Sequence, residues 1–324
     1  MQREPTTTAI IPTLNGEKRV PDVLRAIGHQ PQAALQDLRV IVVDNGSPPS
    51  SLRAIEAADE TKALRDAGVP VEFISEPRSG ASFARMRGAE STDADYLVFL
   101  DDDNVPEPDF FAVGPRAFAE FPEVGMLVSR IHASWEEPPP SAVYKRRALL
   151  AINEALGEQS ITWSGDSIAP TLTAGMWVRR EPFLSAVRSS RWGNLLPDRC
   201  GGSLMCGGDI EFGIRIARSG WKIRYEPDLR LQHIIPIGRT GMAYMARLIY
   251  SIARSEQTLL DRYPLTRGLG GRSRRVAANV AKLTLAPLAG LVRCDLAESV
   301  FVAAGSLGVL AGPYRLEEGA QNGG

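Results

Sequence analysis

The sequence predicts an α/β protein with a Rossmann-like, mostly parallel sheet flanked by helices. Short apolar runs alternate with helical patterns over the first 110 residues, and the apolar runs are nearly continuous. Strands of this kind are buried on both faces, which is typical of parallel sheets covered by helices. Each run also ends in polar or turn residues. In such sheets the ligand lies beyond the carboxyl ends of the strands, so these ends indicate the binding edge.

The expected elements follow one another at short intervals. Strands are predicted where β-branched and apolar residues run together, at 7–13, 38–47, 69–76 and from 96 onward. Helices are predicted where apolar residues recur every three to four positions, at 19–30, 50–68 and 80–92. The segments after the four strands are PTLNGE, DNGS, EPRSGAS and DDDN. We expect them to converge on one edge of the sheet.

Composition limits the class of protein. The chain has 324 residues, of which 44% are hydrophobic, enough for one large domain or two intimate ones. A formal net charge of −1 does not support a nucleic-acid partner. Three cysteines without CxxC spacing argue against a disulfide framework and against a zinc site. With no signal-peptide pattern at the N-terminus, the cytoplasm is the expected location.

The C-terminal part, 241–324, is expected to be a helical extension ending in a disordered tail. No apolar run reaches the length of about 18 residues needed to cross a membrane. The apolar segments 276–292 and 299–312 predict amphipathic helices packed on the catalytic body. The basic stretch at 267–275 keeps the alternative of peripheral contact with the inner face of a membrane open. A homodimer surface is equally compatible with these helices.

The segment YLVFLDDDNVPEPDFF, at 96–111, joins an apolar strand to three consecutive aspartates. Like charges so close together repel and cannot be buried unpaired, so a positive group is expected beside them. Carboxylates at a strand end suit Mg²⁺ or Mn²⁺, which usually share their coordination sphere with substrate phosphates. The alternative is a solvated acidic turn or helix cap.

Five segments together resemble family 2 glycosyltransferases of the GT-A fold, in order and spacing. They are AIIPTLNGEKRVPDVLRAI, VIVVDNGSPPSS, EPRSGASFARMRGAE, YLVFLDDDNVPEPDFF and MCGGDIEFGIRIARSGWKIRYEPDLRLQH. The resemblance implies transfer of a sugar from a nucleotide-sugar to an acceptor hydroxyl, with inversion. It implies a catalytic domain over 1–240, with a nucleotide-sugar half at 6–110 and an acceptor half at 111–240.

The resemblance also implies a divalent metal, Mn²⁺ or Mg²⁺, which would offset charge on the leaving diphosphate. By this likeness Asp103 binds the metal directly, while Asp101 and Asp102 contact ribose or metal-bound water. His233 is implied as a further metal ligand. Its alternative is a buried core histidine.

The catalytic base implied by the resemblance is Asp209, in the segment GGDIEFG. A helical pattern follows it, so the helix dipole is expected to favour its ionised form. Gly208 stands where many relatives have glutamate, a departure from the pattern. Glu211 cannot share the helical face of Asp209 and is interpreted as structural. The alternative for Asp209 itself is a helix cap.

Nucleotide contacts are implied at the other strand ends. The implied residues are Pro12, Thr13, Asn15, Asp44, Asn45 and Arg85. Asn45 replaces an acidic residue, but its amide can still donate to and accept from uracil. A UDP-sugar is therefore the expected donor, with GDP- and dTDP-sugars as alternatives. For Arg85 the alternative is a solvated helix face.

The segment TLTAGMWVRREPF, at 171–183, resembles the family's strand at the sugar and acceptor floor, which implies acceptor contacts at Gly175 and Trp177. Small residues would leave room for a hexose and the indole would stack on it; the alternative for Trp177 is a core tryptophan. The segment 132–166 predicts a linker into a mobile helix that forms a lid or part of the acceptor groove. Glycan, lipid-linked and small-molecule acceptors stay open. A nucleotidyltransferase and a non-catalytic nucleotide- or sugar-binding module are the alternative functions.

Overall fold

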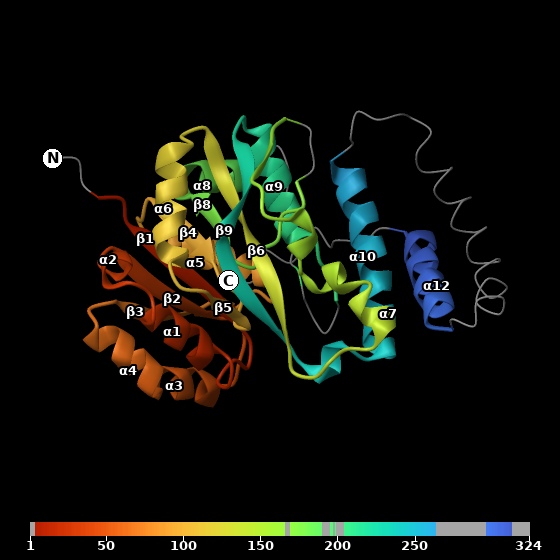
Figure 1. Cartoon of the computed structure of the whole chain (residues 1–324), viewed down its shortest axis with the longest axis horizontal. Helices are drawn as coiled ribbons and strands as arrows, with labels where there is room; N and C mark the ends of the chain where they lie inside the picture. Colours follow the sequence, from red (N-terminus) through yellow and green to blue (C-terminus); the bar gives the residue numbers. More distant parts are fainter. Residues whose placement is uncertain are drawn as a thin grey trace.

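The computed structural model describes residues 4–165, 169–189, 195–196, 198, 204–263 and 296–312. Its centre is a nine-stranded sheet with the strand order β3-β2-β1-β4-β8-β6-β9-β5, and β7 pairs with β9. Helices cover both faces of this sheet, and two further helices, α10 and α12, stand beside its β6–β9 end (Figure 1). The predicted α/β architecture is confirmed.

The N-terminal half of the sheet is entirely parallel. Its strands are β1 (Thr7–Thr13), β2 (Leu38–Asp44), β3 (Val71–Ser75) and β4 (Tyr96–Phe99). Its helices are α1 (Val20–Gly28), α2 (Gln32–Leu35), α3 (Pro49–Ala57), α4 (Asp59–Asp66) and α5 (Ala81–Glu90). Every residue of β1 is buried, as the continuous apolar runs predict.

Two local features differ from the prediction. The expected helix 50–68 is two helices, because Ala58 between α3 and α4 has an extended backbone with φ −62° and ψ 147°. The short helix α2 precedes β2 and had not been predicted. At four residues it is too short to leave a clear apolar period in the sequence.

The second half of the sheet is mixed. Its strands are β5 (Asn104–Pro106), β6 (Val124–Trp135), β7 (Ile161–Trp163), β8 (Met176–Arg179) and β9 (Lys222–Ile235). Its helices are α6 (Phe110–Glu120), α7 (Ser141–Tyr144), η1 (Arg147–Leu150), η2 (Glu154–Leu156), α8 (Arg180–Arg188), α9 (Gly208–Arg218) and η4 (Ile237–Arg239). β5 pairs antiparallel with β9 and sets Asn104 opposite His233. This pairing brings the acidic segment to a histidine about 130 residues later in the chain.

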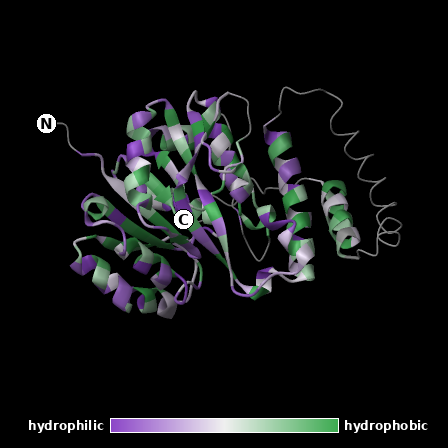
Figure 2. Ribbon diagram, viewed as in Figure 1, coloured by the Kyte–Doolittle hydropathy of each residue, from purple (hydrophilic) through white to green (hydrophobic). Residues whose placement is uncertain are grey.

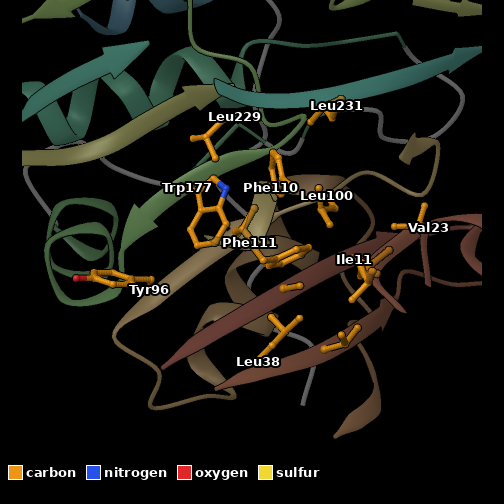
Figure 3. Packing of buried hydrophobic residues seen from close by; sticks show 14 of the residues in the cluster. Ile11, Val23, Leu38, Tyr96, Leu100, Phe110, Phe111, Trp177, Leu229 and Leu231 are labelled. Atoms are coloured by element: carbon orange, nitrogen blue, oxygen red, sulfur yellow. The ribbon is translucent and has the colours of Figure 1, made fainter. Parts of the chain in front are cut away.

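The core explains why Trp177 does not face a ligand. Its side chain is 0% exposed and lies between Phe110 and Phe111, with ring centroids 5.8 Å from each. Figure 3 shows the indole within the apolar cluster that includes Leu229 and Leu231. The prediction of a sugar contact at Trp177 is therefore wrong, because β8 turns this residue into the core.

Among the described residues of 241–324, the α-helices are α10 (Met242–Arg262) and α12 (Leu296–Ala311), which pack against each other. The hydropathy colouring shows α12 as largely apolar (Figure 2). Within the described ranges, no helix combines the length and the apolar character needed to cross a membrane. Of the two expected helices, 299–312 corresponds to α12, whereas 276–292 lies outside the described residues.

A buried ionic cluster joins α9 to α10. Glu211 is fully buried and accepts hydrogen bonds from Arg215, Arg262 and the hydroxyl of Tyr263. Its other oxygen accepts from the backbone N–H of Leu196. Burial and the Glu211 carboxylate raise the pKa of Tyr263, so its hydroxyl stays a donor. Glu211 thus has the structural role predicted for it.

Replacing Glu211 should destabilise the protein strongly. In Glu211→Ala, the fully buried Arg215 loses its carboxylate partner, and we expect the free energy of unfolding to fall by about 3–5 kcal/mol. Glu123→Ala removes only an exposed pair with Lys222, which solvent screens, and should cost far less than the loss of Glu211. Urea unfolding of both variants gives the comparison. Equal losses would contradict the role of the cluster.

Candidate active site

A cavity of about 350 Å³ opens at the carboxyl ends of the parallel strands. This volume lies within the usual range for small-molecule sites, about 300–1,000 Å³. Its polar lining residues are Thr13, Arg19, Asn45, Arg85, Asp101, Asp102, Asp103, Thr173, Asp198, Asp209, His233 and Arg239. Four of the five carboxylates in this set come from predicted positions. The acidic segment after β4 and Asp209 at the start of α9 therefore face one cavity.

Each of the three consecutive aspartates is paired with a different arginine. Arg85 Nη2 donates to Asp101 at 2.6 Å. Arg19 donates to both oxygens of Asp102, at 3.0 and 2.7 Å. Arg239 Nη1 lies 2.9 Å from Asp103. The positive groups that the sequence demanded are therefore supplied by the chain itself, from three separate elements.

Asp102 is held by the loop after β1. The hydroxyl of Thr13 donates to its Oδ2 at 2.7 Å. A side chain at Gly16 would collide with both Thr13 and Asp102, so only glycine permits this close approach. Burial raises the pKa of Asp102, although the Arg19 guanidinium opposes that shift. The loop and the acidic segment thus form one rigid wall of the cavity.

Asp103 and His233 lie at the pairing of β5 with β9. His233 Nε2 is 3.4 Å from Asp103 Oδ1, and Arg239 Nη1 is 3.3 Å from the same nitrogen. Burial opposes ionisation of Asp103, but His233 and Arg239 hold the pKa of this carboxyl below its ordinary value. An ionised carboxylate beside an imidazole nitrogen can hold Mn²⁺ or Mg²⁺ once Arg239 moves aside.

The protein ligands available to such an ion are few. Among the described residues there is no group of three or more His, Cys, Asp and Glu side chains that could hold a metal. Asp103 and His233 therefore fit a divalent ion whose remaining ligands are phosphate and water oxygens, the usual arrangement for Mg²⁺ bound with a nucleotide.

Asp209 is the second residue of α9 and is partly buried. Burial and the neighbouring charge of Asp198 raise its pKa to about 7, against the lowering effect of Arg85. The expectation that the helix dipole favours ionisation is thus outweighed by desolvation and like charge. A carboxyl that titrates near neutral pH is suited to accept a proton in catalysis.

Asp198 was not predicted, and it occupies the space beside Gly208. Both its carboxylate oxygens accept from the Gly208 N–H, at 3.0 and 3.1 Å, and Ser82 donates to Oδ2 at 3.3 Å. A Cβ at position 208 would lie 2.4 Å from Asp198 and from Ser82. The glycine at 208 therefore makes room for a carboxylate supplied by another segment.

The predicted nucleotide residues divide into two groups. Pro12, Thr13, Asn45 and Arg85 line the cavity, whereas Asn15 and Asp44 are not among its lining residues. Asp44 instead accepts from the backbone N–H groups of the turn that follows β2.

The side chain of Asn45 is already engaged. Its two amide hydrogens go to the carbonyls of Glu76 and Arg78, and its oxygen accepts from Gly80. No donor is left for uracil, so the predicted readout through both amide groups is wrong. The residue instead fastens the loop before α5.

Arg85 does not lie on a solvated helix face. It is buried, and its Nε has no hydrogen-bond partner within the described part of the chain. Its guanidinium is therefore held at the cavity wall with donor capacity to spare.

Gly175 is packed against the core and is not among the residues that line the cavity. Its carbonyl accepts from Ser129, and a Cβ there would meet Leu231 at 2.2 Å. The predicted open floor for a hexose at Gly175 is therefore wrong. Thr173 and Ala174, immediately before it, do line the cavity.

Sequence reasoning missed three residues of the site, namely Arg19, Asp198 and Arg239. Each is a charged residue in a loop or at a helix end, where no periodic pattern marks it. Arg239 follows His233 by six residues, and Arg19 follows the first strand closely. The expectation of a positive group beside the aspartates was the signal that could have pointed to both.

The family model described as glycosyl transferase family 2 matches residues 8–186. The protein belongs to this family. It is therefore a glycosyltransferase, as its sequence motifs predicted. A search of curated proteins found no match.

Solved structures of glycosyltransferases share the GT-A fold of this family member. The mannosyltransferase PcManGT from Pyrobaculum calidifontis, in complex with GDP-Man and Mn²⁺, is 18% identical with a TM-score of 0.61, covering 96% of this chain and 87% of that one. S. aureus TarS 1-349 with UDP-GlcNAc is 12% identical with a TM-score of 0.52, covering 96% and 94%. GalNAc-T7 with UDP, GalNAc and Mn²⁺ is 16% identical with a TM-score of 0.52, covering 85% and 54%.

Asp198 should set the pH at which Asp209 ionises. In Asp198→Asn the side chain can still accept from Gly208, but the like charge beside Asp209 is gone. We expect the pH at which Asp209 titrates to fall by about one pH unit. The pH dependence of kcat/KM checks this shift. Ser82→Ala, which removes a hydrogen bond to Asp198 without removing charge, should leave the profile in place, and an unmoved profile in Asp198→Asn would refute the coupling.

Proposed function

We propose that this glycosyltransferase is metal-dependent and inverting, and that it moves a sugar from a nucleotide-sugar to an acceptor hydroxyl with Asp209 as general base. The observation that carries the proposal is that Asp209, with a pKa of about 7, lines the same cavity as the aspartates after β4. In the ionised form, Asp209 takes the proton of the acceptor hydroxyl as that oxygen attacks the anomeric carbon. The bond between that carbon and the diphosphate oxygen breaks, and its electron pair leaves with the diphosphate.

The diphosphate is expected to lie against the wall formed by Arg19, Arg85 and the three aspartates. Arg85 has donor capacity left and is held rigidly by Asp101, so it can bind phosphate oxygens without moving. A divalent metal held by Asp103 and His233 would neutralise charge that develops on the leaving diphosphate. Cationic groups fixed in advance around a leaving anion are among the largest contributors to enzymatic rate.

A UDP-sugar remains the proposed donor, with a GDP-sugar as the alternative. Two of the structures of similar fold hold UDP or UDP-GlcNAc, and one holds GDP-Man. Because Asn45 has no free donor, the base is expected to be recognised by other groups of the loops after β1 and β2. Metal-dependent release of nucleoside diphosphate from a panel of nucleotide-sugars distinguishes these donors. Pyrophosphate release from a triphosphate would instead indicate a nucleotidyltransferase.

Asp209→Asn tests the base directly. We expect turnover to fall by about 10² to 10⁴ while donor binding stays nearly unchanged. In the native enzyme kcat/KM should rise with pH up to about pH 7 and then level off, because only ionised Asp209 accepts a proton. Near-normal turnover of the variant would refute the assignment.

The melting temperature of Asp209→Asn provides a control for correct folding. The pKa of Asp209 is raised on folding, so the native protein loses stability as pH rises from the ordinary carboxyl range through about 7. Asn has no charge to bury, and Asp209→Asn should therefore melt at a higher temperature than the native protein at pH 8. Inactivity combined with a raised melting temperature excludes misfolding as its cause.

Arg239 should compete with the metal ion. Its guanidinium lies between Asp103 and His233, so a cation binding there must displace it. We expect Arg239→Ala to tighten Mn²⁺ binding in the absence of nucleotide about three- to tenfold, measured by electron paramagnetic resonance titration. Arg78→Ala is the control, because it removes an arginine that pairs with Glu76 and lies over Phe83 but does not line the cavity. Weaker or unchanged binding in Arg239→Ala would contradict the competition.

A further inference from the structure

The cavity has two walls of opposite character. The wall next to the strand ends carries the charged residues described above. The other wall is apolar and consists of Leu149, Leu150, Tyr244 and Leu248, which line the cavity and belong to one hydrophobic cluster. These residues come from η1 and from helix α10. In Figure 1, α7 and α10 lie on one side of strands β6 and β9, and β1 and β2 lie on the other.

This apolar wall lies where an acceptor has to enter. In an inverting transfer the acceptor oxygen attacks from the side opposite the leaving diphosphate. The diphosphate is assigned to the charged wall, so the body of the acceptor has to occupy the remaining space, along the apolar wall. This step rests on the proposed function.

The wall is poorly suited to a polyhydroxylated acceptor. Among the described residues that line the apolar side, Tyr244 and the adjacent Thr173 carry the side-chain hydroxyls. Sugar hydroxyls buried against leucines lose their water without gaining partners, which is unfavourable. An alkyl chain in the same place gains from leaving water. The apolar wall therefore favours an acceptor with an alkyl chain over a polyhydroxylated one.

The apolar wall continues into the C-terminal helices. Leu150 and Leu248 belong to a buried cluster that also contains Met245 of α10 and Phe301 of α12. On its outer side α12 exposes Val300 (38%), Leu307 (49%) and Leu310 (37%). The sequence between these two helices, 263–295, contains six Lys and Arg residues and one acidic residue, Asp295. Apolar surface next to basic sequence suits an anionic lipid phase.

We propose that the acceptor is lipid-linked: its hydroxyl is presented to Asp209 by a molecule whose alkyl or isoprenoid chain lies along the wall formed by Leu149, Tyr244 and Leu248. A lipid carrier is favoured over a free polysaccharide or a protein side chain, because neither of these offers an extended apolar segment next to the reacting hydroxyl. The proposal narrows the acceptor class and leaves the donor open.

A homologous series of n-alkyl β-D-glucopyranosides, from methyl to octyl and below micelle formation, tests the proposal. Binding to the full chain loaded with UDP and Mn²⁺ is measured by calorimetry, so that no knowledge of the donor sugar is needed. We expect the Kd to fall about two- to fourfold for each added CH₂ that contacts the wall. An affinity independent of chain length would overturn the proposal.

Substitutions in the apolar wall test whether the dependence of the Kd on alkyl chain length arises there. Leu149→Gln, at a partly buried position of the wall, should flatten the dependence on chain length while UDP binding is kept. Leu149→Ala is a milder change at the same position, should Leu149→Gln fail to fold. Leu310→Gln on the exposed side of α12 is the control and should keep the dependence. A dependence on chain length that stays unchanged in the wall variants would overturn the proposal.

The experiments distinguish failure of the proposed function from failure of the lipid-linked acceptor. If neither UDP nor GDP binds to the native chain in the presence of Mn²⁺, the proposed function fails. If one of them binds and nucleotide release depends on Asp209, but alkyl chain length has no effect, only the lipid-linked acceptor is rejected.

Discussion

The charge balance of three consecutive aspartates constrains the whole site. A strand that ends in Asp101, Asp102 and Asp103 beside a cavity needs nearby positive charge, since like charges in a partly desolvated place repel one another. The chain meets this need with one arginine for each carboxylate, from the loop before α1, from α5 and from η4. These three pairs join elements that are far apart in the sequence, and in doing so they define the cavity.

The pairs differ in how firmly they are held, which suggests different roles. Arg85 is buried, whereas the side chains of Arg19 and Arg239 are 44% and 34% exposed. A buried guanidinium fixes the geometry of the wall, while a more exposed one can move when a phosphate or a cation arrives. The acidic segment is therefore stable without a ligand and still able to exchange its partners.

Asp198 and Asp209 are neighbouring carboxylates, and the charge of the first raises the pKa of the second. Burial and the nearby Asp198 raise the pKa of Asp209 to about 7, while Arg85 only partly opposes them. His233 and Arg239 instead hold the pKa of Asp103 below its ordinary value, against burial. One cavity thus contains both a wall suited to a diphosphate and a group suited to accept a proton. The buried Glu211 cluster holds the helix that carries Asp209.

The sequence alone determined the parallel half of the sheet, its binding edge and the acidic residues on it, because apolar period and strand-end polarity are local properties. The motifs also located Asp209 and His233, about 100 residues or more away from the aspartates. Only the tertiary structure decided which charges meet. No local sequence pattern marks Arg19, Asp198 and Arg239, and only the packing of distant loops brings them to the cavity. Packing also placed Trp177 and Gly175 against the core, since the alternation of a strand does not reveal which of its faces is covered.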